Sequence, residues 1–254
     1  MTGQGIEGLK SCIISKAPSE WDGPPIIGDL IDNGDTVVLV VPIDSAAPKG
    51  RLILPQVQTL RDILDNDACG LVVKQNQLEQ NLAALRTPPK LVVTDSQVFK
   101  QVAEITPQDV ALTSFSVLFA RHKGDLATFV AGAKAIESLK PGDKVLIAEA
   151  CTHHRQEDDI GTVKIPRWLN QHIGGELTYT WVSGGKFPAD LDQYKLVVHC
   201  GACMITRREM LYRLSIVRQS AVPIINYGVL IACLNNILDR ALAPFPKVRQ
   251  IISR

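Results

Sequence analysis

Runs of β-branched and other aliphatic residues alternate with helical segments along most of the chain, and no other feature of the sequence constrains the fold as strongly. Thr36–Ile43 reads TVVLVVPI and Lys144–Ala148 reads KVLIA, and both runs are as continuous as expected of a strand that is covered on both faces. Strands that alternate with helices form βαβ units. We therefore expect an α/β fold made of two consecutive α/β units with mainly parallel sheets.

The expected elements divide into two units near residue 140, at the turn Lys140-Pro141-Gly142-Asp143. The first unit is expected to hold strands at 36–43, 70–74, 90–94 and 110–116, and helices at 55–65, 78–85, 98–105 and 126–139. The second is expected to hold strands at 144–148, 177–182, 196–199 and 223–226, and helices at 165–173, 207–219 and 227–242. The residue identities themselves contain no visible repeat.

Length and charge fit this division and exclude several classes of protein. At about 150 residues per domain, a chain of 254 residues corresponds to one large or two modest domains. A net charge of +1 gives no support to a nucleic-acid partner. The chain start lacks the features of a signal peptide, and the most apolar stretch, Val222–Leu234, is shorter than a membrane span. We therefore expect a cytoplasmic protein with no nucleic-acid partner and no membrane partner.

Cysteine and histidine gather after two of the expected strands. Cys151 and His153 follow KVLIA, and Cys200 and Cys203 follow the strand LVVH, whose last residue is His199. Ligands of open parallel sheets bind beyond the carboxyl ends of the strands. Neighbouring strands would therefore bring three thiols and several imidazoles to one place.

Three kinds of site compete for this group. A Cys-x-x-Cys pair alone is typical of a redox dithiol, but such a site has no need of Cys151, His153 and His199. Structural zinc usually uses two short knuckles, whereas this sequence has one knuckle and a distant strand end. An iron–sulfur cluster on three thiolates leaves one iron with a weaker ligand, which the acidic turn Glu157-Asp158-Asp159 could supply. The pattern favours a metal or cluster site, with iron–sulfur ahead of zinc. The remaining thiols are interpreted as packing residues: Cys12, Cys69 and Cys233.

A specific spacing runs through the second unit: Cys-x-His, 45 intervening residues, then His-Cys-x-x-Cys. Other segments accompany it: Val41-Pro42-Ile43-Asp44, Pro48–Gln56, Asp159-Ile160-Gly161, Lys164-Ile165-Pro166 and Ile224-Ile225-Asn226-Tyr227-Gly228. Together these motifs resemble those of HydF, the family of GTP-binding maturation proteins of FeFe-hydrogenases. The resemblance covers nearly the whole chain.

The resemblance implies a role for each unit. Residues 20–139 would form a dimerisation domain, and residues 140–254 an iron–sulfur cluster-binding domain. Cys151, Cys200 and Cys203 would hold a 4Fe-4S cluster with a labile ligand on the fourth iron. We expect that ligand to be Asp158, with Glu157 and His153 as the alternatives. His153 and His199 would support the ligands or contact the cargo.

The resemblance also implies a carrier. Family members hold the two-iron precursor of the hydrogenase active site and deliver it to the apo-hydrogenase, and the radical-SAM maturases HydE and HydG supply parts of that precursor. The expected partners are thus these three proteins and a second copy of the chain, bound through the first domain. The alternative is a zinc-stabilised α/β interaction domain.

The family's GTPase domain has no counterpart in the sequence. Its phosphate loop is Gly-x-x-x-x-Gly-Lys-Ser/Thr, whereas Gly185-Lys186 is followed here by Phe187, and no Asn-Lys-x-Asp element occurs. Residues 1–19 look like a remnant of that domain's last helix and linker. The chain by itself is therefore expected not to be an enzyme.

Overall fold

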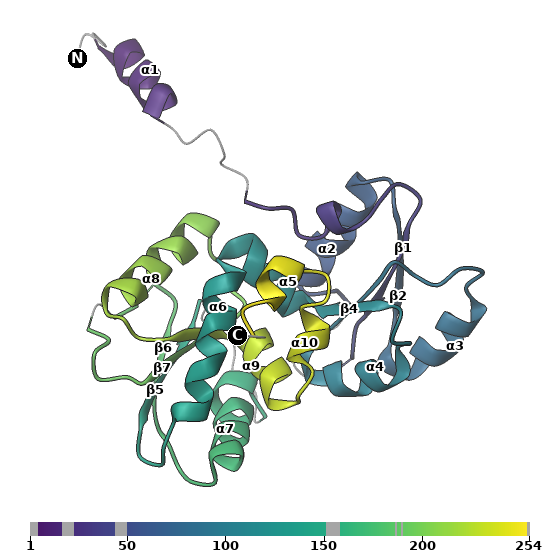
Figure 1. Cartoon of the computed structure of the whole chain (residues 1–254). Helices are drawn as coiled ribbons and strands as arrows, with labels where there is room; N and C mark the ends of the chain where they lie inside the picture. The colour runs from purple at the N-terminus through teal and green to yellow at the C-terminus, as the bar shows by residue number, and fades with distance from the viewer. Residues whose placement is uncertain are drawn as a thin grey trace.

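Two four-stranded sheets organise the chain in this computed structural model, which describes residues 5–16, 23–43, 50–150, 158–185, 187–188 and 190–252 (Figure 1). The strand order is β2-β1-β3-β4 in the first sheet and β6-β5-β7-β8 in the second, and every pairing is parallel. The α/β fold with two consecutive parallel units is thereby confirmed. The strands are β1 (Thr36–Val40), β2 (Cys69–Val73), β3 (Leu91–Thr94), β4 (Ala111–Ser114), β5 (Lys144–Glu149), β6 (Thr178–Ser183), β7 (Leu196–His199) and β8 (Ile224–Asn226).

Helices connect these strands and bury the central ones. The α-helices are α1 (Ile6–Lys16), α2 (Leu54–Asp65), α3 (Leu78–Ala84), α4 (Phe99–Ile105), α5 (Phe115–Lys123), α6 (Leu126–Gly132), α7 (Ile165–Ile173), α8 (Arg207–Gln219), α9 (Tyr227–Leu234), α10 (Leu238–Ala241) and α11 (Pro246–Arg249). Shorter turns are η1 (Gly28–Leu30), η2 (Gln75–Gln77), η3 (Ser96–Val98), η4 (Ala133–Ser138) and η5 (Ile160–Lys164). Every residue of β3 and β7 is buried, as continuous aliphatic strands require. The edge strands β2 and β6 are largely half-exposed.

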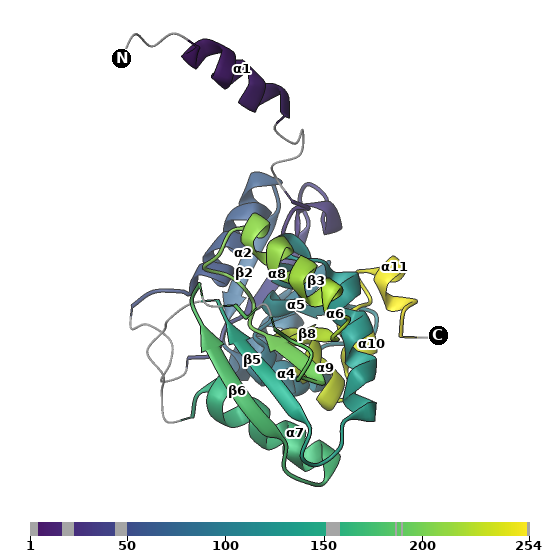
Figure 2. The ribbon, with the colours of Figure 1, turned by 90° about the vertical axis from the view of Figure 1, so that its left-hand side faces the viewer.

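Both units use the same topology although their residues show no repeat. In each sheet the first strand pairs with the second strand on one side and with the third on the other. The chain therefore leaves β1 toward one edge of the first sheet and β3 toward the other edge. It does the same at β5 and β7 in the second sheet. Such a reversal opens a crevice at the carboxyl ends of the two strands. Figure 2 looks onto the second sheet, with β6 and β5 in the foreground.

Helix α5 lies between the units, and the sequence analysis did not predict it. The strand expected at 110–116 ends at Ser114, whose hydroxyl accepts a hydrogen bond from the Val117 amide and so caps the helix. The Asn226 side chain donates to the Ser116 carbonyl at 2.9 Å. A Cβ on Gly228 would lie 2.4 Å from the Ser116 Cβ, so α9 approaches α5 closely. Helix α5 thus joins the sheet that carries the cysteines to the first unit.

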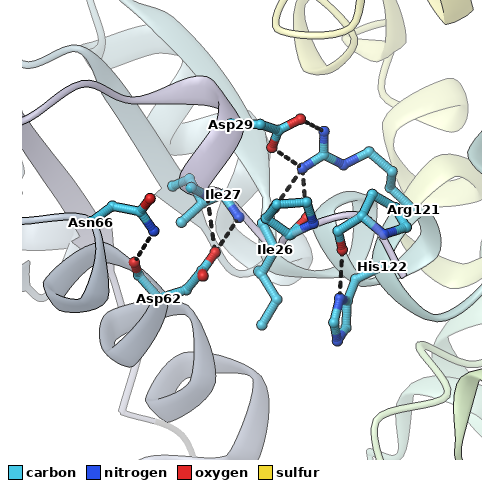
Figure 3. A network of polar contacts seen from close by, with 10 residues as sticks. Ile26, Ile27, Asp29, Asp62, Asn66, Arg121 and His122 are labelled. Carbon is cyan, nitrogen blue, oxygen red and sulfur yellow. Dashed lines mark hydrogen bonds and ion pairs between the residues drawn. The ribbon is translucent and has the colours of Figure 1, made fainter. Parts of the chain in front are cut away.

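Arg121, in the last turn of α5, holds the segment that precedes β1 (Figure 3). Its guanidinium donates to both carboxylate oxygens of Asp29, at 2.7 and 2.6 Å, and to the carbonyl of Ile26. On the other side, Asp62 of α2 accepts from the amides of Ile27 and Gly28. The bidentate pair and these caps fix the path of residues 25–30 across the first unit.

Two predicted helices are interrupted in the structure, and a third is more exposed than a packed helix. The helix expected at 126–139 is α6 followed by the tighter turn η4. The helix expected at 227–242 is interrupted between α9 and α10, where Asn236 adopts a φ of 57°, a left-handed conformation that ends a helix. Helix α1 forms as expected, but Ile6 and Leu9 are 51% and 61% exposed. Within the described ranges, every helix is too short or too polar to cross a membrane.

Candidate metal centre

The carboxyl ends of β5 and β7 meet at the crevice of the second sheet. Ala148 is paired with His199 in the strand register, and the Cys200 amide donates to the Ala148 carbonyl at 2.9 Å. The Ala150 amide in turn donates to the sulfur of Cys200 at 3.0 Å. Ala150 immediately precedes Cys151 in the sequence. The two strand ends that the cysteine pattern singled out are therefore neighbours in the sheet, although Cys151 and His153 lie outside the described residues.

The segment Cys200–Cys203 forms a strained turn at this edge. Ala202 is buried and has a φ of 56°, in the left-handed region that non-glycine residues seldom adopt. Such a conformation costs of order 1 to 3 kcal/mol and tends to occur at functional sites. Both cysteines are half-buried. After the turn, the Thr206 hydroxyl accepts from the Glu209 amide and caps α8.

His199 is fully buried, and both of its ring nitrogens have partners. Nδ1 lies 2.8 Å from the Cys200 carbonyl, and Nε2 lies 3.2 Å from Nη1 of Arg213. Burial lowers the pKa of His199 to about 4; the hydrogen bond to Cys200 opposes this shift and the Arg213 charge adds to it. The ring is therefore neutral, with its proton on Nδ1, where it supports the cysteine turn. Direct contact with a cargo would require one of these bonds to break.

Asp158 and Asp159 occupy different environments. The Asp158 side chain is 65% exposed and forms an ion pair with Lys164 at 3.3 Å, and Lys164 also donates to Gln97 of the first unit at 2.8 Å. Asp159 is buried, and its Oδ1 accepts from the amides of Gly161 and Thr162 at the start of η5. Asp158 is thus the more exposed carboxylate, and any movement of it must break its ion pair with Lys164.

A buried acidic group beside the cysteines was not foreseen. Glu149, the last residue of β5, is 2% exposed, and its Oε1 accepts from the Tyr227 hydroxyl at 3.3 Å. Burial, followed by the charges of Glu149, Cys200 and Asp159, raises the pKa of Tyr227 well above its ordinary value. A Cβ on Gly161 would lie 2.3 Å from the Tyr227 hydroxyl oxygen, so glycine is required for this approach. The one available signal was an acidic residue at the end of the otherwise apolar strand KVLIAE.

The remaining cysteines are only partly as predicted. Cys12 and Cys69 are exposed, so their interpretation as packing residues is wrong. Cys69 begins an edge strand and Cys12 lies on an exposed helix, so neither has a core to pack against. Cys233 does pack against the core. Burial, together with Glu137, raises the pKa of its thiol.

No three described His, Cys, Asp or Glu side chains gather closely enough to hold a metal ion by themselves. Cys200 and Cys203 supply two thiols, and the other predicted thiol belongs to Cys151. A cleft of about 360 Å³ between the two units is lined by Gln97, Lys100, Trp168, His172 and Asn235, among others, and includes none of the predicted site residues. The cysteine crevice is therefore the better candidate for metal chemistry, because soft thiolates and an amide that donates to sulfur suit an iron–sulfur cluster.

Comparison with known families identifies both units. Residues 26–124 match the hydrogen maturase F dimerization domain, and residues 127–244 match the hydrogen maturase F tetramerization domain. The chain belongs to the hydrogen maturase F family. Membership assigns it a role in hydrogenase maturation, and both domains are of the self-associating kind. The resemblance inferred from the cysteine spacing is confirmed, whereas the domain bounds 20–139 and 140–254 remain predictions.

Solved structures resemble this hydrogen maturase F chain only distantly. A shikimate 5-dehydrogenase from Mycobacterium fortuitum is 13% identical with a TM-score of 0.32, and covers 87% of this chain and 97% of its own. The 5,10-methylenetetrahydrofolate dehydrogenase of the silkworm Bombyx mori is 12% identical with a TM-score of 0.26, covering 97% and 94%. An o-succinylbenzoate CoA synthetase from Bacillus subtilis is 10% identical with a TM-score of 0.27, covering 79% of this chain and 51% of its own. Among curated proteins the comparison found no match.

Proposed function

We propose that the chain is a scaffold that binds a 4Fe-4S cluster through Cys151, Cys200 and Cys203. The observation that carries the proposal is the hydrogen bond from the Ala150 amide to the Cys200 sulfur at 3.0 Å. It joins the residue before Cys151 to the Cys200 thiol, across two strands that are adjacent in the sheet. Hydrogen bonds to sulfur stabilise the charge of cluster ligands. When bound, the cluster supplies an iron that the three thiolates leave open to another group.

Asp158 is the proposed weak ligand of that iron. Its exposure and its single ion pair with Lys164 make it a carboxylate that can exchange partners. When Asp158 binds the iron, Lys164 loses this ion pair, and its ammonium can then offset negative charge on an anionic cargo. Asp159 is less suited to exchange, since its Oδ1 caps η5 with three hydrogen bonds.

The proposed cargo is the two-iron precursor of the hydrogenase active site. A carrier must hold its cargo and also release it, and three strong ligands beside one replaceable ligand meet both needs. The proposed donors are the maturases HydE and HydG, and the receiver is the apo-hydrogenase. His153 is proposed to contact the cargo, and His199 to support Cys200 through its carbonyl. The chain itself acts as a carrier rather than as a catalyst.

The dimer is proposed to form at the free edge of the first sheet. Among the described residues, strand β2 is an edge strand of that sheet, and Val72 on it is 39% exposed. Val57 and Leu64 of the adjoining helix α2 are 46% and 56% exposed. An unpaired strand edge beside exposed apolar side chains is a template for association with another chain.

Anaerobic reconstitution with iron and sulfide tests cluster binding. The wild-type chain should take up about four irons, and a variant with Cys151, Cys200 and Cys203 all changed to Ala should take up none. The matched control changes the other three cysteines to Ala and should retain the iron and the EPR spectrum of the reduced cluster. Equal uptake by both triple variants would overturn the proposal.

A further inference from the structure

Arg213 is a buried cation at a helical position that should be apolar. It lies on the buried face of α8, together with Met210, Leu214 and Val217. Only 1% of its side chain is exposed. Arginine is almost never fully buried unless it is paired and hydrogen-bonded. Its position next to the cysteine turn therefore calls for a reason other than packing.

The guanidinium is held on all sides. Nε donates to the Glu209 carboxylate at 3.0 Å, Nη1 to Nε2 of His199 at 3.2 Å, and Nη2 to the Gly184 carbonyl at 2.7 Å. The ring of Phe187 lies 5.3 Å from the guanidinium carbon and 6.3 Å from the His199 ring. Arg213 thus connects α8 with the ends of β6 and β7.

These contacts fix the state of His199. An arginine can only donate, so Nε2 must accept, and the ring proton must lie on Nδ1. Nδ1 then donates to the Cys200 carbonyl at 2.8 Å. A continuous path of two hydrogen bonds runs from a permanent positive charge to the backbone of Cys200. The strained residue Ala202 lies two positions further along the chain.

We propose that Arg213 is a positioning residue for the cluster: through His199 it holds the Cys200–Cys203 turn, and its charge raises the reduction potential of the bound cluster. This inference rests on the proposed function. Three thiolates give the cluster site a net negative charge, which increases by one when the cluster accepts an electron. A nearby cation therefore stabilises the reduced form more than the oxidised form.

The size of the charge effect follows from Coulomb's law. At a separation of about 10 Å and an effective dielectric constant of about 20, one unit charge changes the ratio of reduced to oxidised cluster roughly tenfold. For a one-electron couple, a tenfold change corresponds to about 59 mV. Glu209 opposes the effect, because its carboxylate neutralises part of the Arg213 charge.

A redox titration of the reconstituted full chain with dithionite and mediators tests the charge. Arg213→Gln should lower the midpoint potential by about 59 mV, which corresponds to a tenfold change in the ratio of reduced to oxidised cluster. Arg213→Lys keeps the charge, so its midpoint potential should return most of the way to the wild-type value. Glu209→Gln should shift the potential in the opposite direction, and this variant keeps the buried arginine in place. The matched control is Arg218→Gln on the same helix, which removes an equal charge from a side chain that is 58% exposed. Equal potentials in wild type, Arg213→Gln and Glu209→Gln would overturn the charge effect.

Hydrogen exchange of the metal-free chain tests the positioning role separately. Amides of residues 200–203 should exchange at least tenfold faster in Arg213→Lys than in wild type, because lysine cannot reproduce the planar fork that orients His199. Arg218→Gln should leave them unchanged. Unchanged exchange in Arg213→Lys would overturn the positioning role. If the wild-type chain bound no cluster, the proposed function would fail, and the exchange result would still decide whether Arg213 holds the turn.

Discussion

Gly132 provides a sharp test of how the cysteine-bearing sheet is packed. It is the last residue of α6, and a Cβ there would lie 2.0 Å from the carbonyl oxygen and 2.6 Å from the carbonyl carbon of Ile224 in β8. Both neighbours are backbone atoms, so no side chain can move aside. In Gly132→Ala, the helix must therefore move away from β8 by about 1 Å, and a gap of that size forfeits up to half of each dispersion contact along it.

Overpacking of this kind costs typically 1 to 3 kcal/mol and occasionally more, while alanine returns up to about 1 kcal/mol of helix propensity. Because the clash is with backbone, we expect the upper part of this range, so that Gly132→Ala lowers the free energy of unfolding by about 1 to 3 kcal/mol, and Tm by about 2 to 12 °C. Urea denaturation followed by circular dichroism measures the change. Gly8→Ala is the control, since nothing lies within 4 Å of that Cβ and no loss is expected. An unchanged urea midpoint for Gly132→Ala would show that α6 does not approach β8 this closely.

Three further predictions concern the site and the surface. Gly161→Ala should push the Tyr227 hydroxyl away from Glu149 and lower the iron retained after reconstitution, whereas Gly185→Ala, with open space at its Cβ, should not. In the metal-free native chain, brief alkylation followed by mass spectrometry should find Cys12 and Cys69 modified before Cys233. Burial raises the pKa of the Cys233 thiol and so slows its reaction. Equal rates of modification would contradict the burial of Cys233. Leu64→Lys should reduce the mass measured by light scattering without changing the circular dichroism spectrum. Leu9→Lys, at another exposed leucine, serves as the control. An unchanged mass for Leu64→Lys would place the dimer contact elsewhere.

The central strands were predictable because burial on both faces leaves a continuous aliphatic pattern. Leu196–His199 and its neighbours were found with almost the observed bounds for this reason. The order of strands within each sheet is set by contacts between distant residues, which local patterns do not contain. Helix α5 was missed because its first residues, Phe115 and Val117, continue the apolar run of β4, and only the cap at Ser114 separates them.

The candidate site, like the fold, was predictable from the sequence only in part. Cys200 was expected beside the end of β5 on the assumption that the two strands are neighbours in a parallel sheet. The pairing of Ala148 with His199 and the Ala150 hydrogen bond to the Cys200 sulfur agree with that assumption. Arg213 was missed because a charge on a helix is ordinarily assigned to solvent. Its position between Met210 and Leu214, at the spacing of a buried face, was the signal available. Glu149 was missed because its partner Tyr227 lies 78 residues away in the sequence.

Metal analysis of the anaerobically purified full chain tests the central claim most directly, because it separates an iron–sulfur scaffold from a zinc-stabilised interaction domain. The account predicts about four irons and as many acid-labile sulfides per chain, lost together when Cys200 is changed to Ala. One zinc per chain without acid-labile sulfide would contradict it.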